Sequence, residues 1–161
     1  MSFTPSLLLK TNVSDMSAFK RICFAVAVAL LTGCSSFHNE WKAASKAPIP
    51  SNSIEGPWSG DWLSDVNGHH GSLRCVVTKT SETTYRAHFR AHFLKIFRFT
   101  YAATLNGRET NGVVTLQGEA NLGKLAGGIY KYDGRATPTD FRSTYASKHD
   151  HGAYQMARPV R

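Results

Sequence analysis

The amino-acid sequence predicts an all-β protein, an eight-stranded antiparallel up-and-down barrel that follows a cleaved signal peptide and a flexible tether. Three observations lead to this fold class. Apolar and polar residues alternate in short segments after residue 54, turn residues separate these segments, and no helical pattern is long enough to connect parallel strands. Closing eight strands into a barrel removes both exposed edges and leaves an interior that side chains fill or that holds one small ligand.

The first 33 residues have the layout of an export signal. Residues 22–31, ICFAVAVALL, form an unbroken apolar run directly after Lys20 and Arg21. The run is about half as long as the roughly 20 apolar residues of a membrane-spanning helix, so we expect it to be removed as a signal peptide. Met16 begins an ordinary short basic segment, which makes it a candidate for the true start of translation.

The signal ends in LTGC, residues 31–34, which resembles the lipobox of bacterial lipoproteins. The resemblance implies that the peptidase cuts before Cys34, which then carries a thioether-linked diacylglycerol and an acylated amine. Several acyl chains anchor a protein durably, because each buried methylene contributes about 0.8 kcal/mol. Ser35 follows the cysteine, where an aspartate would retain such a protein in the inner membrane of enteric bacteria, so the resemblance favours the outer membrane.

The alternative for Cys34 is an ordinary buried or disulfide-bonded cysteine. The chain has three cysteines, of which Cys23 is lost with the signal. Once Cys34 is alkylated, Cys75 is the last thiol, and no disulfide can form within the chain even in an oxidising compartment. We therefore expect Cys75 to pack as a small hydrophobic residue.

Behind the signal, the sequence divides into a linker over residues 34–53 and a barrel domain over residues 54–161. Residues 37–53 contain two prolines, many small residues and no sustained periodicity, which is typical of a flexible tether. Cleavage lowers Lys+Arg from 19 to 16 and Asp+Glu from 11 to 10, so the mature chain stays basic, with a net charge near +6.

The clearest strand pattern covers residues 85–105. The odd positions from 85 to 93 and from 97 to 105 are apolar, and a tight hairpin at residues 94–96 would pair Phe93 with Phe97 and Phe89 with Tyr101. Two earlier strands flank the Asn-Gly turn signal at residues 67–68, one over 56–65 and one over 71–80. Four later strands are predicted over residues 113–121, 127–136, 140–147 and 152–158, with residues 106–112 as a connection before the first of them.

The start of the first strand, Gly56-Pro57-Trp58, resembles the G-x-W signature of the lipocalin and avidin-like barrels. The resemblance implies a lipocalin-like barrel in which Trp58 closes one end and an arginine near the end of the last strand packs across it. Arg158 is placed to do so, because it shares the inward parity of Tyr154 and Met156.

No catalytic motif is visible in the sequence. It contains no nucleophile elbow, no zinc-binding His-Glu helix motif and no phosphate loop, and Glu119, Asp133 and Asp140 lie on separate segments. We therefore expect no enzyme activity, no catalytic residues and no cofactor.

Two histidine pairs raise the question of a metal site. His88 and His92 share a strand face, but their Cα atoms would lie roughly 13 Å apart, too far for one ion. His149 and His151 lie two apart in a turn and would form a site with a third histidine from residues 69–70 if the ends meet. A solvated polar turn is the favoured interpretation, so no metal is expected.

The aromatic residues with inward parity suggest a ligand. They either line a pocket for a small hydrophobic or aromatic molecule, in the barrel or at its mouth, or fill the barrel as its core. The candidate ligand-binding residues are Tyr85, Phe89, Phe99, Tyr101, Tyr130, Tyr132 and Tyr145. The predicted function is that of a lipid-anchored binding protein of the bacterial cell envelope.

A basic row on the outer face supports an alternative function, an envelope interaction module. The row contains Arg86, His88, Arg90, His92 and Arg98. It would dock on an anionic polymer or on lipid headgroups, which a tethered protein meets at high local concentration, or it is simply the solvated face of an amphipathic strand. Export separates the protein from nucleic acid, so no nucleic-acid partner is expected.

Overall fold

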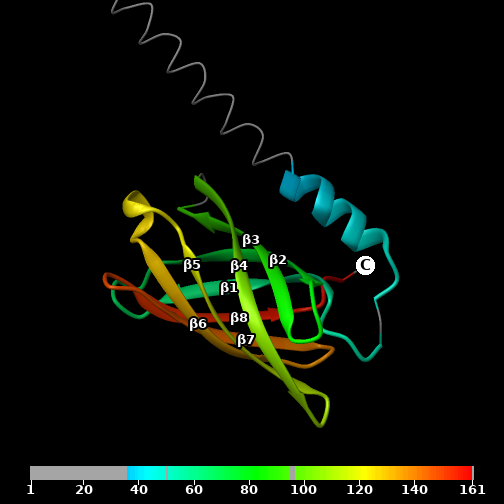
Figure 1. The fold of residues 1–161 in the computed structure, drawn as a ribbon. Helices are drawn as coiled ribbons and strands as arrows, with labels where there is room; N and C mark the ends of the chain where they lie inside the picture. The colour runs from blue at the N-terminus through cyan, green and yellow to red at the C-terminus, as the bar shows by residue number, and fades with distance from the viewer. Residues whose placement is uncertain (1–35, 50, 95–96, 161) are drawn as a thin grey trace, which may run out of the picture. The chain divides into compact units, whose positions relative to one another are not determined.

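The computed structural model describes residues 36–49, 51–94 and 97–160. Eight strands pair in sequence order, each antiparallel to its neighbours, and β1 pairs with β8 to close the barrel (Figure 1). The predicted fold class is confirmed. The strands are β1 (Gly56–Ser64), β2 (His70–Lys79), β3 (Thr84–Phe93), β4 (Phe97–Thr110), β5 (Val113–Asn121), β6 (Ile129–Ala136), β7 (Asp140–Ala146) and β8 (His151–Ala157), with a 3-10 turn, η1 (Lys124–Ala126), between β5 and β6.

The predicted register of the β3–β4 hairpin is confirmed. Phe93 pairs with Phe97, and Phe89 pairs with Tyr101. The odd positions of β3 face the interior, where Phe89 is 1% exposed. A slip of one residue would move this whole set to the outer face, so the inward parity specifies the register.

The prediction ended β4 too early. It placed a connection at residues 106–112, whereas β4 runs to Thr110 and only Asn111 and Gly112 form the turn, with φ of 52° and 76°. Two consecutive positive φ values suit a two-residue hairpin turn, which favours Asn-Gly. Gly107 has a different role, because a Cβ there would lie 2.5 Å from the Tyr85 ring, so the glycine makes room for that ring inside the barrel.

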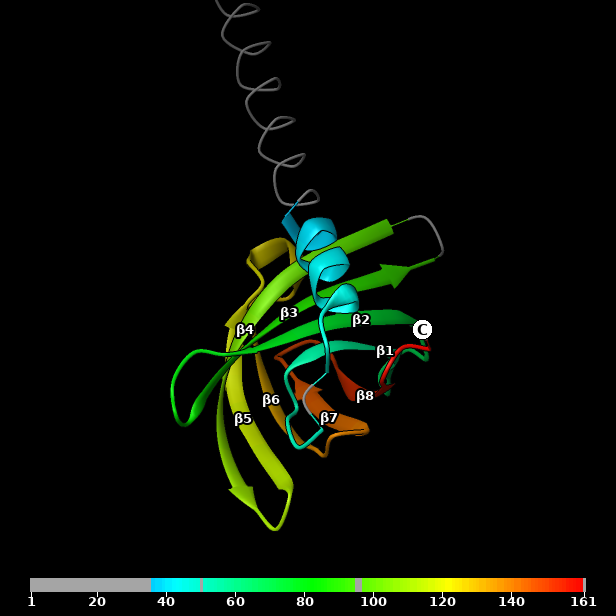
Figure 2. The same cartoon turned by 90° about the vertical axis from the view of Figure 1, so that its right-hand side faces the viewer.

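The linker prediction is also corrected, because residues 36–46 are helical. Phe37 on this helix is 1% exposed, and its ring meets His88 on β3 edge to face, with centroids 5.0 Å apart. Glu40 accepts hydrogen bonds from Arg86 at 2.9 Å and His88 at 2.5 Å. Figure 2 shows the helix in cyan in front of β2 and β3. Aromatic and ionic contacts therefore pack residues 36–46 against the outer face of the sheet.

The predicted signal peptide and Cys34 lie outside the described residues. Within the part of the chain that the structure describes, no helix has both the length and the hydropathy needed to cross a membrane.

Candidate functional site

A pocket of about 380 Å³ lies at the end of the barrel where β1, β3, β5 and β7 finish. Its volume falls in the range of ordinary small-molecule sites, roughly 300–1,000 Å³. Its walls are largely aromatic, and the exposed rings of Phe97 and Phe99 lie at its rim. The lining residues are Trp62, Leu73, Ala91, Phe93, Phe97, Arg98, Phe99, Tyr101, Leu122, Ala126, Tyr130, Tyr145, Asp150 and Tyr154.

The predicted ligand-binding residues divide into two groups. Phe99, Tyr101, Tyr130 and Tyr145 line the pocket, whereas Tyr85, Phe89 and Tyr132 belong to the buried core. Phe89 packs behind the pocket wall, with its ring centroid 5.1 Å from that of Tyr101. Some of the inward aromatics therefore line a pocket at one end of the barrel, and the others fill the barrel interior beyond that pocket.

Trp62 is a pocket residue that the list of candidate ligand-binding residues left out. Its indole N–H donates a hydrogen bond to the carbonyl of His92 at 3.0 Å, and its ring lies 6.2 Å from that of Phe93. Gly71 makes this possible, because a Cβ there would lie 2.0 Å from the His92 carbonyl oxygen and 2.9 Å from the indole nitrogen. The signal in the sequence was its parity, since Trp62 is on the same side of β1 as Trp58.

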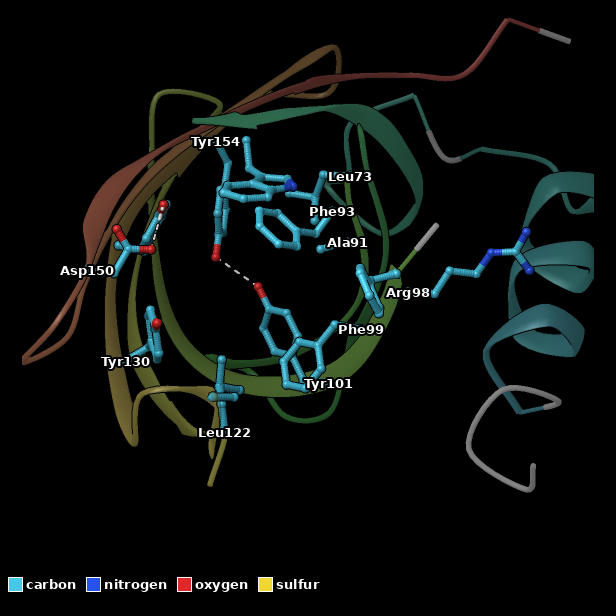
Figure 3. A pocket seen from close by; sticks show the side chains of 14 residues that line it. Leu73, Ala91, Phe93, Arg98, Phe99, Tyr101, Leu122, Tyr130, Asp150 and Tyr154 are labelled. Carbon is cyan, nitrogen blue, oxygen red and sulfur yellow. Dashed lines mark hydrogen bonds between the residues drawn. The ribbon is translucent and has the colours of Figure 1, made fainter. Parts of the chain in front are cut away.

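Two tyrosine hydroxyls meet inside the barrel. Those of Tyr101 and Tyr154 are 2.8 Å apart and share a hydrogen bond, drawn as a dashed line in Figure 3. The hydroxyl of Tyr132 is buried and has no hydrogen-bond partner among the described residues. Burial raises the pKa of Tyr132 to about 12 and raises the pKa values of Tyr101 and Tyr154 well above their ordinary value. All three phenols are therefore neutral at neutral pH.

Asp150, in the β7–β8 turn, supplies a carboxylate to the pocket wall. Its Oδ1 accepts a hydrogen bond from Ser64 Oγ at 2.6 Å, and its Oδ2 accepts one from the Tyr145 hydroxyl at 3.4 Å. Burial, and after it the Asp150 charge, raises the pKa of Tyr145. The flanking His149 and His151 are exposed, and no three metal-binding side chains converge anywhere in the described residues.

The opposite end of the barrel contains Trp58 and Arg158. Trp58 is fully buried, its indole N–H donates to the Ile54 carbonyl at 2.8 Å, and the Arg158 guanidinium carbon lies 3.9 Å from the ring centroid. The guanidinium also donates to backbone carbonyls on both sides of the barrel opening, those of Ser53, Glu55, Pro57 and Pro138. Burial lowers the pKa of Arg158 to about 10, which leaves it charged at neutral pH.

The predicted basic row is not an open surface. Arg86 and His88 are hydrogen-bonded to Glu40, and Arg90 lies over the Phe37 ring, 4.5 Å from its centroid. His88 is only 6% exposed. The helix over residues 36–46, which the sequence pattern did not predict, therefore lies against the centre of the predicted docking face.

The remaining two members of the basic row lie beside the rim of the pocket. His92 shares a hydrogen bond with Ser72 at 3.0 Å, and its partial burial, together with the charges of Arg98, Arg74 and Arg90, lowers its pKa. The Arg98 side chain points away from the cavity in Figure 3. Neither residue therefore places a cationic group inside the pocket.

Comparison with known proteins finds structural similarity but no matching family model. No family model matches the chain. No curated protein matches it either. A designed fluorescence-activating β-barrel is similar to it with a TM-score of 0.47 and 11% identity, over 70% of this chain and 100% of the designed one. The comparisons therefore name no function for the chain.

Proposed function

We propose that the protein is a lipid-anchored protein of the bacterial cell envelope that binds a small hydrophobic or aromatic ligand in the pocket at the rim of its barrel. The observation that carries this proposal is the aromatic pocket of about 380 Å³ at one end of a barrel whose opposite end is filled by Trp58 and Arg158. Aromatic walls with a few convergent polar groups are typical of small-molecule sites.

Binding without catalysis fits the chemistry of the pocket. A general acid or base works best when its pKa lies near the operating pH. Burial moves the phenols of Tyr101 and Tyr154 away from that range, so they are suited to donate and accept hydrogen bonds as neutral groups. We therefore propose that the ligand leaves the pocket chemically unchanged.

Filling the pocket tests the proposal. Ala91 lines the cavity, so Ala91→Phe adds a ring inside it, whereas Ala102→Phe adds the same ring at an exposed position of β4. We expect the fluorescent hydrophobic probe N-phenyl-1-naphthylamine to bind the wild type and Ala102→Phe equally, and to bind Ala91→Phe at least tenfold more weakly. Circular dichroism checks that both variants keep the barrel. Equal binding by Ala91→Phe, or none by the wild type, would contradict the proposed site.

The lipid anchor is proposed on the sequence LTGC behind a basic and apolar segment. Cys34→Ala should replace the processed, membrane-attached protein by a soluble or an uncleaved form. Separation of the membranes by density should place the wild type in the outer membrane, because Ser35 and not aspartate follows the cysteine. Unchanged processing and membrane attachment in Cys34→Ala would refute the anchor and leave the binding site untouched.

A further inference from the structure

Asp150 supplies a carboxylate to the largely aromatic wall of the pocket. It is half-buried and has a hydrogen bond to each oxygen, from Ser64 and from Tyr145. Each carboxylate oxygen accepts at two positions, so both keep one for a ligand. Figure 3 shows Asp150 and Tyr130 on the same side of the cavity.

No described cation neutralises this carboxylate. Asp150 takes part in none of the salt bridges between described residues, although the chain has a net charge of +8. Arg98 contributes to the lining, but its side chain points away from the cavity in Figure 3. An uncompensated charge at a partly buried site is costly unless a partner pairs with it. The pocket wall therefore presents one carboxylate that has no ion-pair partner among the described residues.

Asp150 attracts positive charge, and the aromatic rings beside it do so as well. The ring centroids of Tyr130 and Tyr145 lie 5.9 Å apart, and those of Tyr145 and Tyr154 lie 5.0 Å apart. Aromatic faces carry negative quadrupole charge and attract cations within about 6 Å, most strongly where water is excluded. A group placed among these rings within reach of Asp150 meets two kinds of attraction for a positive charge and apolar surface for the rest of the molecule.

We infer that the pocket selects a cationic ligand, an amine attached to an aromatic or hydrophobic body, with the amine against Asp150 and the body among the rings. This inference rests on the proposed function and specifies its ligand class. An ammonium donates to the free positions of the carboxylate, and such charge-assisted hydrogen bonds are roughly twice as strong as neutral ones. The rim residues Phe97 and Phe99 contact the apolar body as it enters.

Three probes of one size test the charge preference directly. These are 1-naphthylmethylamine, 1-naphthalenemethanol and 1-naphthoate, which at pH 7 are cationic, neutral and anionic. Isothermal titration calorimetry of the purified protein should show that the amine binds about tenfold more tightly than the alcohol and that the carboxylate binds most weakly. In Asp150→Asn, which keeps the shape of the side chain and an acceptor for Ser64, the amine should bind no more tightly than the alcohol.

Asp61→Asn is the matched control. Asp61 is exposed on the neighbouring strand β1 and does not line the pocket, so this variant changes the net charge equally. It should keep the full preference for the amine. If it loses the preference as Asp150→Asn does, the effect comes from the overall charge of the protein, and the role given to Asp150 is wrong.

The possible outcomes separate the two proposals. If none of the three probes binds the wild type, the proposed function fails, and the ligand class fails with it. If the alcohol binds as tightly as the amine, the binding pocket stands and the cationic preference is refuted. The comparison of probes on the wild type decides this even if Asp150→Asn does not fold.

Discussion

Trp58→Ala should be one of the most destabilising single changes in the barrel. The side chain is 0% exposed, and its ring contacts the Arg158 guanidinium on one side and Phe141 at 5.7 Å between centroids. Truncating a fully buried tryptophan costs about 3–5 kcal/mol, because apolar surface is lost and the cavity does not collapse. The indole hydrogen bond to Ile54 is lost as well, which leaves a buried carbonyl without its donor.

Trp62→Ala provides the comparison, because Trp62 is only half-buried and lines a pocket that water can enter. We expect this change to lower the free energy of unfolding by about 1–2 kcal/mol, because it removes less buried apolar area than Trp58→Ala and leaves no closed cavity. Urea denaturation followed by circular dichroism measures both free energies of unfolding. The midpoint should fall without a change in the slope, which reports the surface exposed on unfolding.

The comparison between the two tryptophans is what makes the prediction refutable. A loss below about 1 kcal/mol for Trp58→Ala would mean that the ring is solvated and does not close the barrel. A loss in Trp62→Ala equal to that in Trp58→Ala would mean that both ends of the barrel are packed alike. Either result would contradict the division into a filled end and an open end.

Two further predictions concern the helix and the tyrosines. Glu40→Gln weakens the contacts of the helix over residues 36–46 with Arg86 and His88, so it should lower stability by about 1 kcal/mol and speed hydrogen exchange of the helix amides, with Lys42→Gln on the exposed side as control. Unfolding should also set in above pH 10. Burial raises the pKa of four tyrosines above their unfolded value of about 10, so the folded state holds these protons more tightly than the unfolded state. Each tyrosine therefore contributes stability that is complete below pH 10. Above pH 10 this contribution is lost at up to about 1.4 kcal/mol per pH unit. Arg158 has the opposite effect on the change of stability above pH 10, because its pKa is lowered to about 10, but it is one group against four tyrosines. Phenolate absorbance should therefore rise together with unfolding, and full titration of a folded protein near pH 10 would contradict the burial of Tyr101, Tyr132, Tyr145 and Tyr154.

The strands were predictable because parity in a strand is a local property. The alternation through Phe89, Phe93, Phe97 and Tyr101 survives the hairpin, so one stretch of sequence specifies both the faces and the pairing. The end of β4 was not predictable in the same way. Asn-Gly occurs at residues 106–107 and again at 111–112, and only the packing of Tyr85 over Gly107 distinguishes the glycine inside the strand from the one in the turn.

The helix was missed because its stability comes from the barrel. Residues 36–46 present only Phe37 and Trp41 as large apolar residues, one turn apart, which is too short a stripe to predict a helix. Their partners are Arg90 and Arg74 on the sheet, which lie over the two rings. An acidic residue between two aromatics, facing a basic strand, was the signal available.

The pocket was predictable only in part for a geometric reason. Period two identifies which side chains point inward but not how far along the barrel axis each one lies. Tyr85 and Tyr101 share the inward parity, yet the first belongs to the core and the second lines the cavity. The contribution of Asp150 depends on a turn, where strand parity does not apply.

Because Trp58 and Arg158 fill one end of the barrel, its pocket is open only at the other end and, in the part of the chain that the structure describes, no channel runs through it. Under the proposed function, a ligand would therefore enter and leave the barrel at the same end. Phe97, 59% exposed at the rim of this end, would be among the side chains that an entering ligand contacts. A molecule that takes up the proposed ligand would therefore approach the barrel at the end where β1, β3, β5 and β7 finish.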